Sequence, residues 1–351
     1  MPRRFRYAAI ALLVSLLAGL AWHLGRPLPV PASVTVQHSY SIALEAAHDG
    51  KPGAARLLYQ QMARTDLSDI RRAGLLAELP NYPSPQALKL AKADLAGDQP
   101  LVRHAAIDCL VQLVSRAQRS LLLGPLLSDP DLEIRFHAAR ALLDLSPDDL
   151  GLYFGELEKV LDQYIGALQQ QPDDAAAQLQ LARVQLHNDA YAQADAALQR
   201  ARTLQPENLD TVPVAVSVLE GQHQPDKARE VLADQLQRHP QSAFLQYQLG
   251  QWLLRNGAPE FALLALTRAV ELEPDNQDYR YDLALALHGL EQVEAAQRQL
   301  DEMLRRQPAN RKARVLLIGY WKETGQLQNV QILLAELEQQ NPDDPALQLA
   351  Q

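Results

Sequence analysis

Residues 243–276 read AFLQYQLGQWLLRNGAPEFALLALTRAVELEPDN, which is two Ala/Leu-rich stretches of helical character that end at a proline. Gly250 in the first stretch is small enough to let two helices approach closely. In the second stretch, Leu266 lies between the small residues Ala262 and Ala269, so it is suited to pack against the first helix. Pro274 marks the end of the unit, because proline cannot continue a helix. This window of 34 residues therefore predicts one helix–turn–helix unit.

The same spacing runs through the second half of the chain. Prolines separated by 34 residues lie at positions 172, 206, 240, 274, 308 and 342. Self-similarity at a fixed period indicates a repeat architecture, and a 34-residue helix–turn–helix unit resembles the tetratricopeptide repeat (TPR). The second unit has Gln235 where a small residue is expected, and the fifth has Ile318 and Val330, a drift expected of a capping unit. Residues 157–171 resemble an additional second helix that starts the stack.

A different repeat comes earlier in the chain. An Ile-Arg or Val-Arg pair recurs every 32 residues, at 70–71, 102–103 and 134–135. The stretches DQPLVRHAA (98–106) and DPDLEIRFHAA (129–139) resemble short HEAT repeats of the lyase-associated kind. In that family the arginine pairs with a carboxylate of the turn, so the resemblance implies a structural role for Arg71, Arg103 and Arg135. It implies no lyase chemistry.

These patterns predict an all-α fold, an α-solenoid of HEAT-like repeats followed by TPRs. Only 5% of the residues are aromatic, and the apolar 47% is dominated by Ala and Leu, which favour helices over sheets. We expect HEAT-like repeats over residues 39–150 and TPRs over 151–351. A further helix pair is expected at 40–49 and 52–63.

The first residues resemble a membrane-targeting segment. Arg3, Arg4 and Arg6 precede an uncharged run, YAAIALLVSLLAGLAW, at residues 7–22. A helix of 16 to 18 residues is about 24–27 Å long, near the lower limit for crossing a bilayer. We expect residues 1–24 to be a signal anchor in the inner (plasma) membrane and residues 25–38 to be a proline-rich linker. The soluble region then faces the periplasm, because the basic flank stays in the cytoplasm. The alternative is a cleaved signal peptide and secretion to the periplasm, since residues 19–21 read Gly-Leu-Ala.

Charge and motif content argue against several function classes. A net charge of −9 disfavours binding to nucleic acid. The single cysteine, Cys109, cannot form an internal disulfide or a CxxCH haem site. The sequence contains no HExxH, phosphate-binding glycine loop or GxSxG motif. We therefore expect no catalytic site, no cofactor and no metal, and an unrecognised enzyme remains only as an alternative.

One segment points to a cellular setting. The region from about residue 40, including RAGLLAELPNYPSP at 72–85, resembles the C-terminal HEAT–TPR region of exported multihaem c-type cytochromes. Those proteins carry CxxCH haem sites ahead of this region, whereas this chain carries the predicted anchor. The resemblance implies a periplasmic scaffold or adaptor for protein partners, associated with c-type cytochromes or respiratory complexes. The alternative is a cytochrome c maturation chaperone that binds apocytochrome segments.

The TPR resemblance also implies a peptide-binding groove, because the first helices of successive units line the concave face. The family's groove positions correspond here to Arg183, Leu186, Phe244, Tyr247, Gln251, Arg255, Tyr281, His288, Lys312 and Lys322. Aromatic rings beside cations suit an extended peptide or an acidic C-terminus. The alternative is that these are ordinary surface positions, with the tyrosine rings packed on their neighbours.

Overall fold

A computed structural model describes residues 39–350, and every regular element in that range is an α-helix or a 3-10 helix. This confirms the predicted all-α class. None of the helices within the described range is both long and apolar enough to cross a bilayer. The predicted anchor and linker, residues 1–38, lie outside the described residues, so both stay predictions.

The region where HEAT-like repeats are expected is built from short helices, several of which start at proline or follow a serine cap. Pro85 and Pro100 occupy the first turn of their helices, and Ser115 forms a capping box with Gln118. The elements are α2 (Tyr40–His48), α3 (Ala54–Met62), α4 (Asp69–Glu78), η1 (Leu79–Asn81), α5 (Pro85–Leu95), α6 (Pro100–Leu113), α7 (Arg116–Leu123), η2 (Gly124–Ser128), α8 (Leu132–Leu142), α9 (Pro147–Leu150) and η3 (Gly151–Tyr153).

Two of the three repeated arginines, Arg103 and Arg135, lie at the fourth residue of a helix. Arg103 in α6 pairs with Asp129 of a turn, as predicted. Arg135 in α8 instead donates to the main-chain oxygens of that turn. Arg71 is in none of the ion pairs found among the described residues and lies over the Tyr40 ring, 5.4 Å from its centroid. The expected carboxylate pairing is therefore wrong for Arg71, because α4 begins at Asp69 and its fourth residue is Arg72, which pairs with Asp94. The start of the helix, and not the 32-residue spacing, sets the position of the arginine.

The second half contains the helix pairs that the proline spacing predicts. After α10 (Phe154–Gln169) come α11 (Ala175–His187), α12 (Tyr191–Leu204), α13 (Thr211–Gly221), α14 (Pro225–Arg238), α15 (Ala243–Arg255), α16 (Pro259–Leu272), α17 (Gln277–Gly289), α18 (Val293–Arg306), α19 (Arg311–Glu323), α20 (Leu327–Gln340) and η4 (Pro345–Ala350). The predicted close approach is present at Gly250, where an added Cβ would lie 2.7 Å from the Leu266 side chain. The predicted α-solenoid is therefore confirmed.

A second 34-residue register explains where each unit begins. Two residues after each of the six spaced prolines stands Asp, Asn or Ser, and its side-chain oxygen accepts a hydrogen bond from a main-chain N–H two or three residues further on. These residues are Asp174, Asn208, Ser242, Asn276, Asn310 and Asp344. Such bonds satisfy N–H groups that lack a partner within the helix. Each unit thus ends at its proline and restarts at this polar residue.

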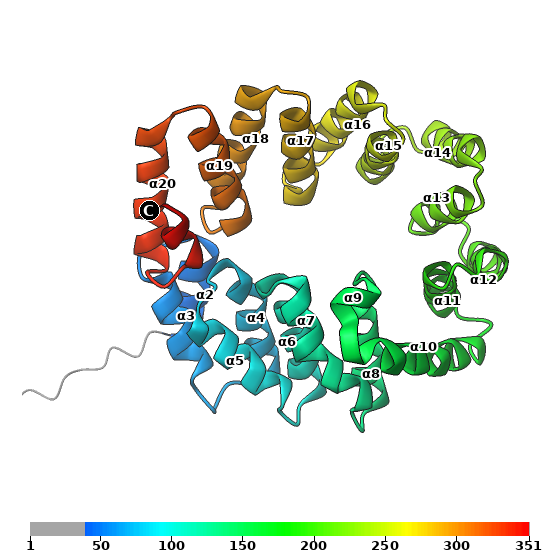
Figure 1. The fold of residues 1–351 in the computed structure, drawn as a ribbon, viewed down its shortest axis with the longest axis horizontal. Coiled ribbons are helices and arrows are strands. Elements are labelled where there is room, and N and C mark those ends of the chain that lie inside the picture. Colours follow the sequence, from blue (N-terminus) through cyan, green and yellow to red (C-terminus); the bar gives the residue numbers. More distant parts are fainter. Residues whose placement is uncertain (1–38, 351) are drawn as a thin grey trace, which may run out of the picture. The chain divides into compact units, whose positions relative to one another are not determined.

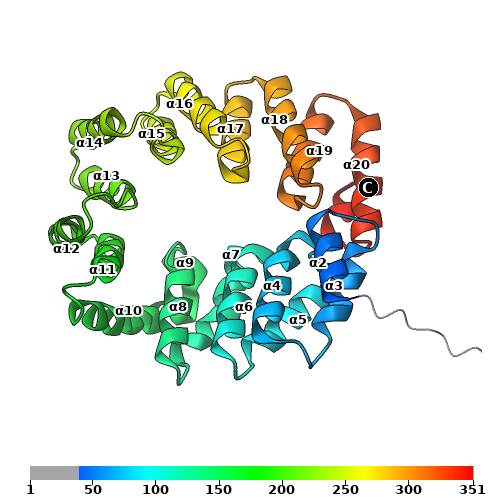
Figure 2. The same cartoon turned by 180° about the vertical axis from the view of Figure 1, so that it is seen from behind.

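The two ends of the helical array contact each other within the compact unit Tyr40–Gln351. The Gly53 amide donates to the Gln339 carbonyl at 2.7 Å, and Asn341 Nδ2 donates to the Pro83 carbonyl at 2.8 Å. The apolar cluster that extends from Ala46 to Val218 also contains Ala309. Figure 1 and the reverse view in Figure 2 both place α20 beside α2 and α3. We call this contact the seam; because of it, the last unit does not cap the array against solvent as its sequence drift predicts.

Candidate binding surface at the seam

Several predicted groove residues link neighbouring units of the array. Tyr247 Oη and Gln251 Nε2 in α15 each donate to Asp282 Oδ2 in α17 at 2.7 Å. The Tyr247 ring also stacks on Tyr279, with 4.6 Å between the ring centroids. Burial, followed by the hydrogen bond to Asp282, raises the pKa of Tyr247 above the ordinary tyrosine value. These side chains therefore hold two adjacent first helices together.

The same kind of link recurs on either side of this pair. Arg255 forms an ion pair with Glu220 of the preceding unit at 3.3 Å. His288 stacks on Tyr320 of the following unit at 3.9 Å, and its Nε2 lies 2.7 Å from Glu323 Oε2. The alternative interpretation, that these are ordinary surface positions whose side chains pack on their neighbours, predicts such contacts. Their role in peptide binding stays a prediction.

The remaining predicted positions differ in how much surface they offer. Phe244 packs against the apolar cluster of α13–α15, and Leu186 packs against the larger N-terminal cluster. Arg183 is half-buried, whereas Lys312 and Lys322 are exposed. Only Tyr281 and Lys312 of the predicted positions line the cavity at the seam described next.

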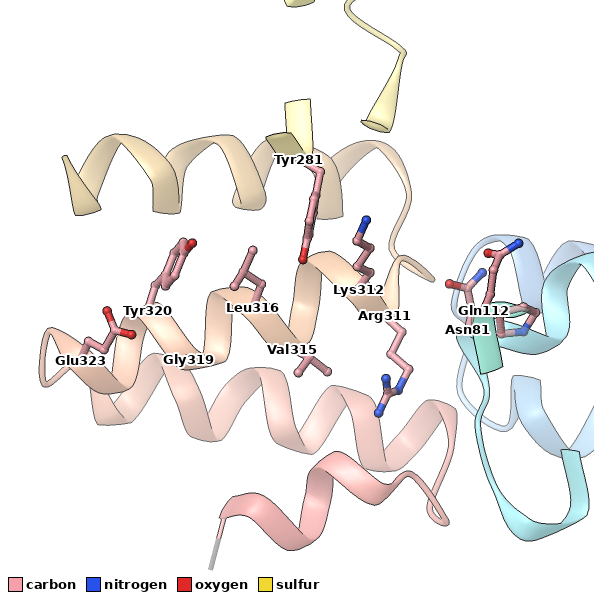
Figure 3. A pocket seen from close by; sticks show the side chains of 11 residues that line it. Asn81, Gln112, Tyr281, Arg311, Lys312, Val315, Leu316, Gly319, Tyr320 and Glu323 are labelled. Atoms are coloured by element: carbon pink, nitrogen blue, oxygen red, sulfur yellow. The ribbon is translucent and has the colours of Figure 1, made fainter. Parts of the chain in front are cut away.

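Beside the seam lies an open cavity of about 600 Å³ whose walls come from distant parts of the sequence. One wall consists of Tyr281 on α17 and of residues on α19, including Lys312 and Leu316. Asn81 at the end of η1 and Gln112 in α6 form the facing wall, as Figure 3 shows. Sequence reasoning did not find Asn81 and Gln112, because no local pattern marks residues that meet only when the array closes.

The polar groups around this cavity leave one cation without a carboxylate. Arg311 donates to both oxygens of the fully buried Asp344 at 2.6 and 2.7 Å, so its charge is neutralised. Lys312 Nζ lies 3.8 Å from the centroid of the Tyr281 ring, a cation–π contact. No ion pair found within the described residues includes Lys312. The cavity therefore has a net positive end at the start of α19.

The aromatic side chains of the cavity are neutral at physiological pH. Burial, and then the nearby Asp282, raises the pKa of Tyr281. Burial, followed by Tyr281 and Glu323, raises the pKa of Tyr320 to about 12. Searching the described part of the chain reveals no group of three or more metal-binding side chains. The arrangement of a cation, two amides and an apolar and aromatic wall is suited to recognising a ligand.

Comparison with known proteins gives structural neighbours but no family. A scan of protein-family models finds no match, and a search of curated proteins finds none either. Yeast Tom70 is 14% identical with a TM-score of 0.48, over 92% of this chain and 65% of that chain. YrrB, described as a TPR protein with an unusual peptide-binding site, is 19% identical with a TM-score of 0.37, over 54% and 98% of the two chains. TTC0263, a TPR protein of Thermus thermophilus, is 21% identical with a TM-score of 0.40, over 58% and 98%. These values assign neither a family nor a partner to the chain.

Proposed function

We propose that this protein is a scaffold that binds extended segments of partner proteins, with the seam cavity as its principal site. The observation that carries the proposal is the cavity itself, where the Lys312 ammonium lies on the Tyr281 ring and has no carboxylate partner within residues 39–350. A volume of about 600 Å³ is typical of a ligand pocket. A pocket with aromatic and aliphatic walls and a few polar groups binds peptide side chains by burying apolar area while it orients their polar ends.

The proposal also includes a location and a type of partner. Residues 1–24 would anchor the scaffold in the inner membrane and present it to the periplasm, as the arginine-led apolar run suggests. The segment 72–85, which resembles the multihaem cytochrome region, supports an association with c-type cytochromes or respiratory complexes. An enzymatic reporter fused after residue 40 tests the location. Activity of a periplasmic reporter at this position is expected, and activity of a cytoplasmic reporter alone would contradict the proposed topology.

The binding function is tested by purifying the tagged full chain from native membranes after mild crosslinking. Proteins recovered with the wild type are compared with those recovered with Lys312→Gln and Tyr281→Ala. Lys227→Gln is the matched control, because Lys227 is an exposed residue of α14 outside the cavity. Partners lost with both cavity variants and kept with the control support the proposal. Identical recovery with all four proteins would overturn it, and haem staining shows whether a multihaem cytochrome is among the partners.

A further inference from the structure

The seam cavity exists only while the two ends of the array are in contact. Asn81 and Gln112 belong to the HEAT-like half, whereas Lys312 and Leu316 lie more than 190 residues later in α19. Among the contacts that hold these parts together are the hydrogen bond from Gly53 to Gln339 and that from Asn341 to Pro83. A ligand that touches both walls therefore binds the closed array and not an open one.

The charges along α19 indicate which end of a ligand lies where. Lys312 is at the first turn of the helix, where the helix dipole also favours an anion. Glu323, at the last residue of α19, is paired with His288. Eleven residues separate Lys312 from Glu323, which is about 16 Å along a helix. An anionic group is thus attracted to the end of the cavity that Lys312 forms.

The facing wall supplies groups that complete such a site. Asn81 is half-buried and Gln112 is exposed, and both line the cavity. Neither side-chain amide has a hydrogen-bond partner among the interactions found within residues 39–350. An amide N–H₂ group donates to a carboxylate oxygen, and hydrogen bonds to charged groups are stronger than those between neutral groups. Lys312 and the two amides therefore complement a carboxylate from both sides of the seam.

We propose that the seam cavity binds a carboxylate of an extended partner segment between Lys312 and the amides of Asn81 and Gln112, and that this binding holds the array closed. The inference rests on the proposed function, since it names the ligand chemistry and the regulation of the same cavity. The carboxylate is that of an Asp or Glu side chain or of a free C-terminus, which share the same chemistry. The side chains next to it pack on Val315 and Leu316, which line the cavity near Lys312 (Figure 3).

Linkage gives the size of the expected effect on closure. A ligand that binds only the closed array shifts the equilibrium toward it by a factor of 1 + [L]/Kd, which is about 100-fold at a ligand concentration of 100 times Kd. The Gly53 amide reports on this equilibrium, because its hydrogen bond to Gln339 crosses the seam. If the Gly53 amide exchanges only after the seam opens, saturating ligand slows the hydrogen exchange of this amide by the same factor.

The test uses the full chain and a library of short random peptides immobilised in three forms. One form has a free C-terminal carboxylate, one has a C-terminal amide and an internal glutamate, and one has the amide with glutamine in place of that glutamate. The best binder is resynthesised in all three forms and titrated against the wild type, Lys312→Gln, Asn81→Ala and Gln112→Ala. Lys227→Gln again serves as the control for the lost charge.

We expect at least one of the two forms that carry a carboxylate to bind with an affinity about tenfold higher than that of the glutamine form. Lys312→Gln should weaken binding about tenfold, and each amide variant about threefold to tenfold, whereas Lys227→Gln should leave it unchanged. Saturating peptide should slow exchange of the Gly53 amide. Equal binding of the glutamine form overturns the carboxylate assignment. If the peptide binds equally well to Asn81→Ala and Gln112→Ala and leaves exchange of the Gly53 amide unchanged, the carboxylate does not bridge the two walls of the cavity. This result overturns the further inference while the proposed function stands. A library without any binder counts against both.

Discussion

Replacing Gly50 by alanine should disrupt the seam at the turn that leads into α19. Gly50 has a φ of +63° in the turn between α2 and α3. An alanine Cβ there would lie 2.8 Å from the Ala309 nitrogen and 2.8 Å from the Pro308 carbonyl carbon. Both are main-chain atoms in the turn that leads into α19, so no side-chain rotation can relieve the clash. The two ends of the array have to move apart.

The cost of this substitution has two parts that a control variant separates. A left-handed backbone costs alanine about 1–2 kcal/mol relative to glycine. Forced contact in a packed interface adds about 1–3 kcal/mol. Gly257 has a φ of +72° and no atom within 4 Å of an added Cβ, so Gly257→Ala carries only the first cost. Gly50→Ala is therefore expected to lower the free energy of unfolding by about 1–3 kcal/mol more than Gly257→Ala.

Urea denaturation measures the difference between the two variants, and hydrogen exchange locates it. Loss of 1–3 kcal/mol at the seam should accelerate exchange of the Gly53 amide about 5-fold to 150-fold in Gly50→Ala. Exchange of this amide in Gly257→Ala should remain close to the wild-type rate. If both variants lose the same free energy and the Gly53 amide exchanges equally slowly in both, the contact between the ends of the array does not exist as described.

Three further outcomes are expected. Burial alone would raise the pKa of Asp129, but hydrogen bonds from Arg103 and from the backbone outweigh it and lower this pKa, so the carboxylate contributes stability above its unfolded pKa of about 4. Asp129→Asn should therefore cost about 2 kcal/mol at pH 7, and the cost should shrink as the pH falls through the lowered pKa of Asp129, as urea titrations at pH 7 and at progressively lower pH would show. Burial, and then nearby acidic groups, raises the pKa of Cys109 to about 12. A thiol reagent should therefore label Cys109 only as the protein unfolds. Rapid labelling of the native protein would contradict the burial of this thiol. Asp282→Asn removes the negative charge beside Tyr247 and should lower its pKa toward the ordinary value, which a phenolate absorbance titration of the variant and the wild type would detect.

Much of the array could be predicted because its determinants are local. Pro274 and its counterparts end helices wherever they stand, and polar residues such as Asn276 start the next helix two positions later. Gly250 opposite Leu266 likewise acts within a single unit. The error at Arg71 arose because a one-residue difference in where α4 begins moves the equivalent position to Arg72. Spacing alone does not reveal such a shift, since helix starts depend on the local cap.

The seam and its cavity could not be predicted in the same way. Tyr281 and Lys312 were found because they occupy groove positions within a repeat. Asn81 and Gln112 share no period with them, and they become neighbours only through the summed rotation of every unit between them. A small change in the packing angle of each pair accumulates over the array, and no single residue encodes it. The closing contacts, such as that of Asn341 with Pro83, join residues 258 positions apart.

The contact between the two ends also changes how the apolar faces of the terminal units are shielded from solvent. In an open solenoid the terminal units need a solvated polar face, and stability is a sum of units and nearest-neighbour interfaces. Here the polar residues of the last unit are buried; Asn341 and Asp344 are 1% and 2% exposed. Asn341 donates to Pro83 of the first repeats, and Asp344 holds Arg311. The first and last units therefore cap each other. Since the ends meet only at the correct curvature, a packing change inside any unit, as at Gly250, also acts on the seam and on the open cavity beside it.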